Sequence, residues 1–172
     1  MQEITPTLWI SDDMDEAAQF YCSLFEDSRV TGSNDHGPDA GEYAGKKMVI
    51  RLELQGQSYV LLNGGETRFT PNESVSFAAG CDSQDEVDRL WAALEQGGEP
   101  GPCGWIKDRY GFSWQVTPTR LYEMLDDPDP EKVQRVTAAF MAVDKRKFEI
   151  SELEAAFEGR SQPSQQPQRV RP

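Results

Sequence analysis

Two stretches of this chain repeat one pattern of apolar and polar positions. Each begins with a short apolar run, Thr5–Ile10 in the first and Val75–Cys81 in the second, which is typical of a β-strand. Apolar residues then recur at positions i, i+3, i+4 and i+7, the spacing of one face of a helix. These stripes are Ala17, Phe20, Tyr21 and Leu24 in the first stretch and Val87, Leu90, Trp91 and Leu94 in the second. The pattern therefore predicts a strand followed by a helix, twice.

The two predicted helices also start alike. Asp13 precedes Glu16 by three residues and Ser83 precedes Glu86 by three, so both starts are candidate capping boxes. The strand ends, caps and stripes all match at an offset of 70 residues. Amphipathic helices share their periodicity by chance, but agreement of three features at one offset favours an internal duplication.

More strands are expected after each helix. One hairpin is predicted to join Met48–Leu54 to Ser58–Leu62, and another to join Gly104–Lys107 to Phe112–Thr117. An additional strand is expected near Ser28–Thr31. Each half of the chain then consists of a strand, a helix and a run of two or three strands.

The segment from Gly32 to Gly45 is rich in glycine and polar residues. It is either a mobile lid or a long surface connection, and we favour the connection. His36, the only histidine of the chain, lies in this segment with no cysteine near it in the sequence. We therefore expect a solvated histidine rather than a base or a metal ligand.

Beyond Pro118 the pattern becomes helical. Asp129 followed by Pro130 predicts one helix start, and Ser151 with Glu154 predicts another. The two apolar stripes, which must cover either the flank of the sheet or a second subunit, are Val133, Val136, Phe140 and Val143, and Leu153, Ala156 and Phe157. We expect one domain over residues 1–126, a helical extension over 127–159 and, because its residues are almost all polar or proline, a disordered tail over 160–172.

Charge and composition narrow the classes of partner. The 172 residues carry 30 Asp and Glu against 17 Lys and Arg, a formal net charge of −13, which repels nucleic-acid phosphates and anionic lipids. The sequence contains neither a spanning apolar run nor a signal-peptide pattern, so a cytoplasmic protein without nucleic-acid or membrane partners is expected. Cys22, Cys81 and Cys103 are odd in number and far apart, which indicates buried thiols.

Five short motifs carry a resemblance to a known family. They are Ile4-Thr5-Pro6-Thr7-Leu8-Trp9, Leu62-Asn63-Gly64-Gly65, Ser74-Val75-Ser76-Phe77, Cys103-Gly104-Trp105-Ile106-Lys107-Asp108 and Gly111-Phe112-Ser113-Trp114-Gln115-Val116. In order and spacing they resemble the PhnB-like branch of the vicinal oxygen chelate (glyoxalase/bleomycin-resistance/dioxygenase) superfamily, whose members often carry the label 3-demethylubiquinone-9 3-methyltransferase. The resemblance implies an α+β fold of two tandem βαβββ modules that form a U-shaped mixed β-sheet around a pocket, here with added C-terminal helices, and a homodimer.

Metal-using members of that superfamily place His or Glu at one inward-facing position on two strands of each module. By the helix and glycine landmarks, the resemblance carries these positions onto Pro6, Arg51, Ser76 and Gln115. None of the four is a carboxylate or an imidazole, and Glu53 alone cannot complete the coordination of a divalent cation. We therefore expect no bound metal, and the sequence indicates no other cofactor.

No catalytic residue can be assigned from the sequence. Cys103, Ser76 and Ser113 are candidate nucleophiles, but no general base is identifiable for any of them. A reactive Cys103 would need a cationic neighbour such as Lys107 to lower the pKa of its thiol. Methyl transfer gains no support either, because no strand leads through a glycine-rich turn into a helix with an acidic residue farther on.

The remaining candidates suit a small-molecule site with apolar walls and a few polar groups. Core packing is the alternative for each tryptophan, and strand alternation places Trp114 on the face opposite Ser113 and Gln115. We predict ligand contacts from Trp9, Arg51, Asn63, Ser76, Trp105, Trp114 and Gln115. The expected function is metal-independent binding of a small organic molecule, with no reaction assigned. The alternatives are a metal-dependent lyase or dioxygenase of the same superfamily and a non-catalytic sequestering protein.

Overall fold

The computed structural model describes residues 4–11, 13–67 and 69–160. Contacts within the chain separate it into two compact units, Met1–Thr70 and Pro71–Pro172. Each unit holds a four-stranded mixed sheet with helices, so the predicted α+β class and the tandem βαβββ modules are confirmed. The predicted tail, apart from Arg160, lies outside the described residues.

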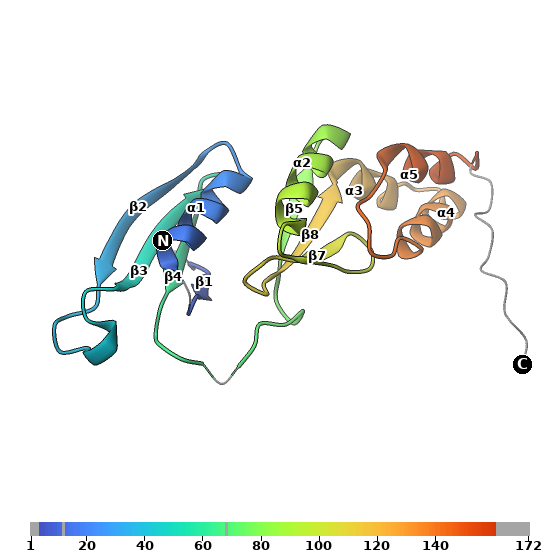
Figure 1. Cartoon of the computed structure of the whole chain (residues 1–172). Helices are drawn as coiled ribbons and strands as arrows, with labels where there is room; N and C mark the ends of the chain where they lie inside the picture. Colours follow the sequence, from blue (N-terminus) through green and yellow to red (C-terminus); the bar gives the residue numbers. More distant parts are fainter. Residues whose placement is uncertain (1–3, 12, 68, 161–172) are drawn as a thin grey trace, which may run out of the picture. The chain divides into compact units, whose positions relative to one another are not determined.

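The first unit is one βαβββ module (Figure 1). Its elements are β1 (Thr7–Trp9), α1 (Met14–Leu24), β2 (Ser28–Asp35), β3 (Lys47–Leu54) and β4 (Gln57–Leu62). The order across the sheet is β1-β4-β3-β2, with β1 parallel to β4 and the other pairs antiparallel. Alternate residues of β3 are buried on the face that α1 covers, which leaves the opposite face free of helix.

Local sequence signals fix the boundaries inside this module. Asp13 Oδ1 accepts hydrogen bonds from the amides of Asp15 and Glu16, so it caps α1 as predicted. Between β3 and β4, Gln55 and Gly56 have φ values of 46° and 76°. Two successive positive φ angles are the backbone of a type I′ turn, and the predicted hairpin is confirmed.

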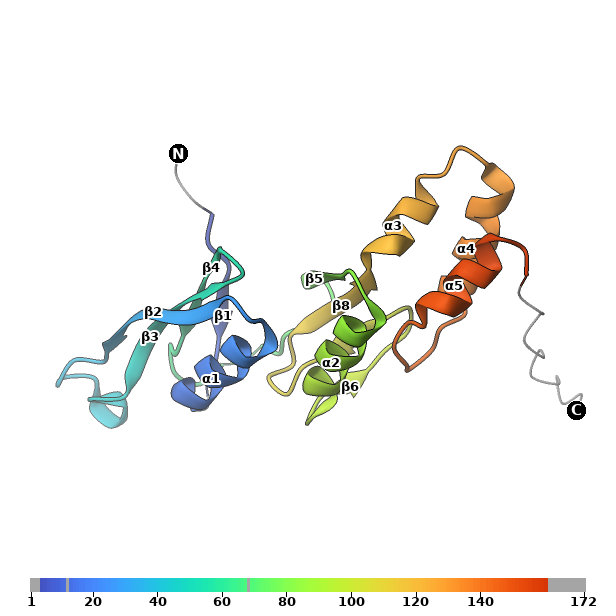
Figure 2. The ribbon, with the colours of Figure 1, turned by 90° about the horizontal axis from the view of Figure 1, so that it is seen from above.

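The second unit repeats the module and adds helices (Figure 2). Its module consists of β5 (Ser76–Cys81), α2 (Gln84–Glu95), β6 (Glu99–Pro100), β7 (Trp105–Lys107) and β8 (Ser113–Pro118). The strand order β5-β8-β7-β6 matches that of the first sheet element for element. Helices α1 and α2 begin 70 residues apart, as the predicted duplication requires.

The register of the first strand corrects one expected position. Thr7 pairs with Val60, which pairs with Arg51, so these three residues share a row on the helix-free face of the first sheet. Pro6, expected at this place, is one residue out of register and falls on the other side of the pleat. Helices α1 and α2 correspond to each other at an offset of 70 residues. Strands β1 and β5, aligned by their positions in the two sheets, correspond with a shift of one residue from that offset.

Strand β2 is longer than predicted. It runs to Asp35 and pairs with β3, so the expected connection from Gly32 to Gly45 is wrong in its first part. The reason is that β2 is largely exposed on both faces and therefore lacks the alternation that marks a half-buried strand. The shorter loop that remains contains a 3-10 turn, η1 (Gly41–Tyr43). His36 in this loop is half-buried, with Nε2 3.0 Å from the Asn63 carbonyl oxygen, so the expectation of a solvated histidine is wrong.

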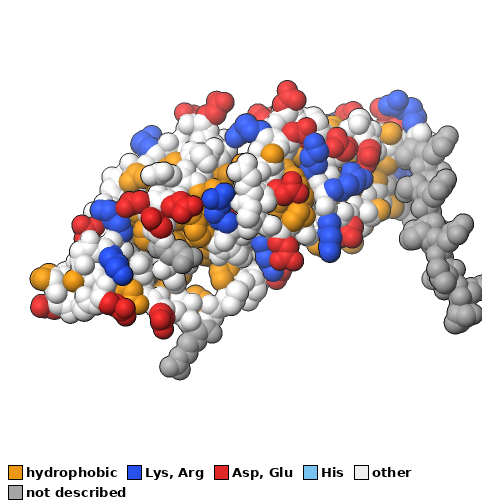
Figure 3. Space-filling view, in the orientation of Figure 1, with side chains coloured by type: hydrophobic (Ala, Val, Ile, Leu, Met, Phe, Trp, Pro, Cys, Tyr) orange, Lys and Arg blue, Asp and Glu red, His pale blue; other side chains and the backbone are white. Residues whose placement is uncertain are grey.

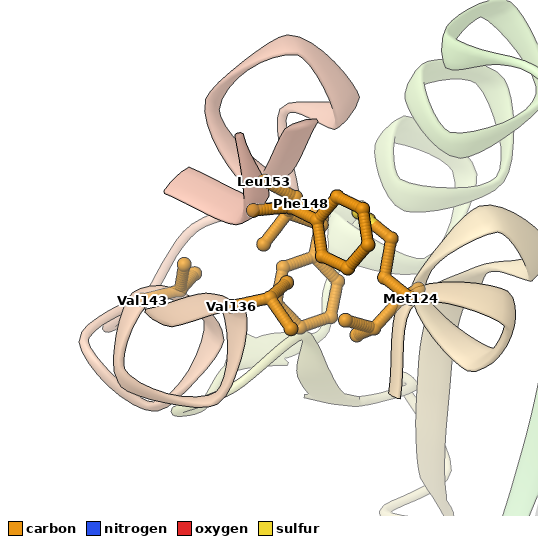
Figure 4. Packing of buried hydrophobic residues seen from close by; sticks show 7 residues of the cluster. Met124, Val136, Val143, Phe148 and Leu153 are labelled. Atoms are coloured by element: carbon orange, nitrogen blue, oxygen red, sulfur yellow. The ribbon is translucent and has the colours of Figure 1, made fainter. Parts of the chain in front are cut away.

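Three helices follow the second sheet: α3 (Thr119–Leu125), α4 (Pro130–Met141) and α5 (Ile150–Phe157). Figure 4 shows labelled apolar side chains gathered between them. The buried cluster consists of Leu121, Met124, Val136, Val143, Phe148, Leu153 and Phe157. Val136 and Val143 of the predicted stripe are thus buried within their own unit, with Phe140 half-buried against the cluster.

One side chain of α2 fixes the start of α5. Gln84 Nε2 donates to the Phe148 carbonyl at 3.0 Å, and Gln84 Oε1 accepts from the Ile150 amide at 2.9 Å. The predicted cap at Ser151 is therefore wrong, since α5 begins at Ile150, two residues before the start that this cap predicts, and its first amide bonds to a distant side chain. Helix α3 and strand β6, which the sequence patterns did not predict, complete the unit.

The surface carries charges of both signs. Acidic and basic side chains are interspersed over the face seen in Figure 3. Within the described ranges, no helix combines the length and the apolar character needed to cross a bilayer.

Candidate functional site

A hollow of about 470 Å³ opens on the helix-free face of the second module. We call it the Trp105 cavity. It lies against β6, β7 and the first residue of β8, and the residues that line it are Glu73, Glu99, Pro100, Gly101, Pro102, Cys103, Trp105, Ile106, Lys107, Ser113 and Lys145. Its volume lies within the range of about 300–1,000 Å³ that is typical of small-molecule pockets.

A tight loop forms one wall of this cavity. Cys103 and Gly104 have φ values of 54° and 74°, and the Gly101 amide donates to the Trp105 carbonyl at 2.8 Å. The Cys103 amide donates to the Val143 carbonyl at 2.7 Å, and the Lys145 amide donates to the Gly101 carbonyl at 3.0 Å. These last two bonds bring Lys145 to the cavity from the far end of α4.

An ion pair and a buried hydroxyl are among the polar groups of the cavity. Lys107 Nζ lies 2.7 Å from Glu73 Oε1, and this hydrogen bond raises the pKa of Lys107 and lowers the pKa of Glu73. Ser113 is 2% exposed, and its Oγ has no hydrogen-bond partner among the described residues. An unsatisfied buried hydroxyl costs about 1–3 kcal/mol, so this atom marks a place where a ligand or water is expected.

The turn between β7 and β8 holds Lys107 and Ser113 in place. Asp108 is 3% exposed, and its Oδ1 accepts from the amides of Tyr110 and Phe112 at 2.9 and 3.1 Å. Asp108 Oδ2 accepts from Trp114 Nε1 at 2.9 Å. One carboxylate therefore closes the hairpin and anchors an indole beneath the sheet.

The predicted site residues of the second module fall in different places. Trp105 lines the cavity. Ser76 and Gln115 lie on the same helix-free face, where Gln115 Nε2 donates to Ser76 Oγ at 2.8 Å. Trp114 is 3% exposed on the opposite face, as strand alternation predicted, with its ring 5.0 Å from that of Phe77.

The predicted site residues of the first module make contacts within the protein. Trp9 Nε1 donates to the Gly65 carbonyl at 3.1 Å, and the Trp9 ring packs on Gly64 so closely that a side chain there would clash. Asn63 is buried, and its Oδ1 accepts from the Gly65 amide at 3.1 Å. Arg51 is exposed and donates to Asn34 Oδ1 at 2.7 Å, while its neighbour Glu53 pairs with Arg29.

The donor set does not suit a divalent cation. Of the positions carried over from metal-using relatives, Arg51 is a cation, and Ser76 is already bonded to Gln115. No cluster of three His, Cys, Asp or Glu capable of holding a metal ion occurs in the described part of the chain. A guanidinium in the first module and neutral hydroxyl and amide groups in the second offer too little negative charge for such an ion.

The contacts of the described residues show no activating group for the cysteines or for the two candidate serines. Burial raises the pKa of the Cys22 thiol and raises that of Cys81 to about 11, so both stay protonated at neutral pH. The half-buried Cys103 thiol contacts the Met141 carbonyl and sulfur at 3.8 and 4.0 Å. Ser76 Oγ accepts a hydrogen bond from the Gln115 side-chain amide, and Ser113 Oγ has no hydrogen-bond partner among the described residues. Neither hydroxyl therefore has a described base that could take its proton.

Of the eleven residues that line the cavity, only Trp105 was among the predicted ligand contacts. Ser113 had been considered only as a nucleophile and Lys107 only as a neighbour of Cys103, although alternation in the predicted hairpin places both on the face of Trp105. Glu73 and Lys145 carry no such signal, because their places depend on the path of the chain before β5 and after α4.

The family model described as 3-demethylubiquinone-9 3-methyltransferase matches residues 2–117. No functionally curated protein matches the chain. The Bacillus cereus PhnB protein has 27% sequence identity and a TM-score of 0.62, over 69% of this chain and 100% of that one.

Two further structures are more distant. Protein PA1353 of Pseudomonas aeruginosa is 23% identical with a TM-score of 0.53, over 66% of this chain and 95% of its own, and indicates the fold alone. The fosfomycin resistance protein FosX of Listeria monocytogenes, in complex with Mn(II) and sulfate, is 15% identical with a TM-score of 0.47, over 66% and 88%.

Proposed function

This chain belongs to the 3-demethylubiquinone-9 3-methyltransferase family, and from that membership we propose that it binds a small organic molecule in the Trp105 cavity without a metal ion. The observation that carries the proposal is the cavity itself. A half-buried indole and two prolines give it apolar walls, and Lys107 and Ser113 converge on it from neighbouring strands. Apolar walls with few, convergent polar groups are characteristic of small-molecule sites.

The family's description implies a methyl donor, and the residues present do not suit an adenosyl cofactor. Such a cofactor uses a glycine-rich turn between a strand and a helix, and neither connection that precedes α1 or α2 contains glycine. The amides at both helix starts are already bonded to Asp13 and Ser83. We therefore assign no methyl-transfer step and no reaction to this site.

Four finer points belong to the same proposal: the location, the oligomeric state, the other ligand contacts and the domain boundaries. The protein acts in the cytoplasm as a homodimer, and light scattering tests the second point by a mass of about twice the 19.3 kDa chain. The other predicted contacts, Trp9, Arg51, Asn63, Ser76, Trp114 and Gln115, stay predictions. The proposed domain boundaries after residues 126 and 159 also stay predictions.

Fluorine NMR of protein labelled with 5-fluorotryptophan tests binding directly. The chain has four tryptophans, and Trp105→Phe identifies the resonance of Trp105. In a screen of neutral and charged fragments, we expect compounds that shift this resonance saturably and leave that of Trp91, buried on α2, in place. A screen in which no fragment moves the Trp105 resonance selectively would overturn the proposal.

Removal of metal ions is expected to change nothing. Because no described cluster of side chains can coordinate a divalent ion, treatment with a strong chelator should leave the thermal midpoint within about 1 °C. Fragment binding at Trp105 should persist in the chelator as well. A fall of several degrees that one divalent cation restores would favour the alternative, a metal-dependent lyase or dioxygenase.

A further inference from the structure

The chemistry of the Trp105 cavity narrows the class of ligand further. Ser113 Oγ is screened from solvent yet unpaired, and Ser113 lines the cavity. A buried hydroxyl without a partner is the donor that a ligand oxygen would satisfy. Lys107 is the cross-strand neighbour of Ser113, so the two side chains stand beside each other on the helix-free face.

The ammonium of Lys107 is held by Glu73. The two charged groups are 2.7 Å apart, and the Glu73 side chain is 59% exposed while that of Lys107 is 34% exposed. Glu73 sits in a turn before β5, where the Ser74 amide donates to Asn72 Oδ1 at 2.9 Å, and is not part of the sheet. An exposed ion pair is weak, so another carboxylate can replace Glu73 at small cost.

We propose that the ligand is a small organic anion, whose head group replaces Glu73 beside Lys107 and accepts a hydrogen bond from Ser113. This inference rests on the proposed function of the same cavity. Opening of the Lys107–Glu73 pair frees the ammonium on the strand position opposite the buried Ser113 hydroxyl, so one oxyanion can accept hydrogen bonds from both donors. The apolar body of the ligand lies against Trp105 and the two prolines.

The remaining charges of the cavity limit the ligand to a single anionic group. Lys145 and Glu99 also line it, so its two cations are balanced by two carboxylates while Glu73 stays in place. Displacement of Glu73 leaves one positive charge in excess. A second anionic group would face Glu99 and a protein whose formal net charge is −13.

Matched acids and amides test the inference. The probes are benzoate and benzamide, hexanoate and hexanamide, and indole-3-acetate and its amide, titrated against the fluorotryptophan-labelled full chain. At least one acid is expected to bind about ten-fold more tightly than its amide. Lys107→Gln should remove that preference, and Ser113→Ala should weaken the acid by several-fold.

Glu73→Gln gives the discriminating result. Removal of the competing carboxylate should tighten binding of the acid by several-fold and leave that of the amide unchanged. Glu123→Gln and Arg120→Gln are the controls, because they make the same charge changes in a 2.6 Å ion pair on α3, outside the cavity. If Lys107→Gln does not fold, the Glu73→Gln titration decides alone, since Glu73 is exposed.

The outcomes distinguish failure of the inference that the ligand is an anion from failure of the proposed small-molecule binding. Amides that bind as tightly as their acids would overturn the inference, as would neutral fragments that reach Trp105 when none of the acids does. Unchanged affinity of the acids in Glu73→Gln would overturn it as well. In each of these cases the cavity still binds small molecules, whereas the absence of any selective fragment would remove the proposed function itself.

Discussion

Replacement of Asp108 by alanine is expected to lower the free energy of unfolding by about 3–5 kcal/mol. The carboxylate is buried and accepts three hydrogen bonds, two from amides of the β7–β8 turn and one from the Trp114 indole. Alanine leaves all three donors without that acceptor, and the indole donor is in the core. Asp108→Asn should cost less, because its single oxygen can still serve the turn while its NH₂ group opposes the indole N–H.

Urea denaturation of the variants measures this loss. Asp35→Ala is the matched control, because Asp35 is an exposed carboxylate at the end of β2 that pairs with Lys47 at 2.8 Å, and its loss should cost less than about 1 kcal/mol. Fluorine NMR should also show Trp114 in altered surroundings in Asp108→Ala. A cost for Asp108→Ala no larger than that for Asp35→Ala would contradict the role assigned to the turn.

This carboxylate illustrates how a structural group supports a functional one. Asp108 lies between Lys107 and the turn that leads to Ser113, and the cross-strand register of these two residues depends on that turn. A shift of one residue would turn Ser113 to the opposite face of the sheet. We therefore expect Asp108→Ala to weaken fragment binding at Trp105 even where the protein remains folded.

The elements that the sequence predicted are those whose signals are local. Helices α1 and α2 have caps and apolar stripes within a dozen residues, and the turn at Gln55 and Gly56 lies between two alternating strands. Strand β2 was underestimated because neither of its faces is strongly buried. The start of α5 was misplaced because its cap, Gln84, is 66 residues away in the sequence.

The candidate site was predictable to a smaller extent for a similar reason. Trp105 followed from the strand pattern and the resemblance, and it does line a cavity. Lys145 reaches that cavity only through hydrogen bonds between residues 101–103 and 143–145. The Glu73–Lys107 pair likewise joins a turn to a strand that lies 34 positions later in the sequence. The periodic pattern of apolar and polar residues does not predict such a contact.

Phe148 joins the C-terminal helices to the loop that walls the cavity, and Phe148→Ala is expected to cost about 3–5 kcal/mol of unfolding free energy. The residue is 1% exposed within the cluster of α3, α4 and α5, and its ring lies against Gly104, where even a Cβ atom would clash. Its carbonyl accepts the hydrogen bond from Gln84. Truncation of this ring leaves a cavity at the place where these helices contact the loop.

Two measurements separate this role from general loss of core packing. Tyr122→Ala is the control in urea denaturation, because Tyr122 is an aromatic residue of α3 that is 46% exposed, and its cost should stay below about 1 kcal/mol. The second measurement is the rate at which a thiol reagent labels Cys103, whose amide bonds to Val143 and whose neighbour Gly104 touches the ring. Loosening of this contact should speed labelling in Phe148→Ala under conditions where the protein is folded, while buried Cys81 stays protected. Equal labelling of Cys103 in the variant and the parent would show that the loop keeps its shape without the ring, and the cavity wall would then depend on the hydrogen bonds of residues 101–103 alone.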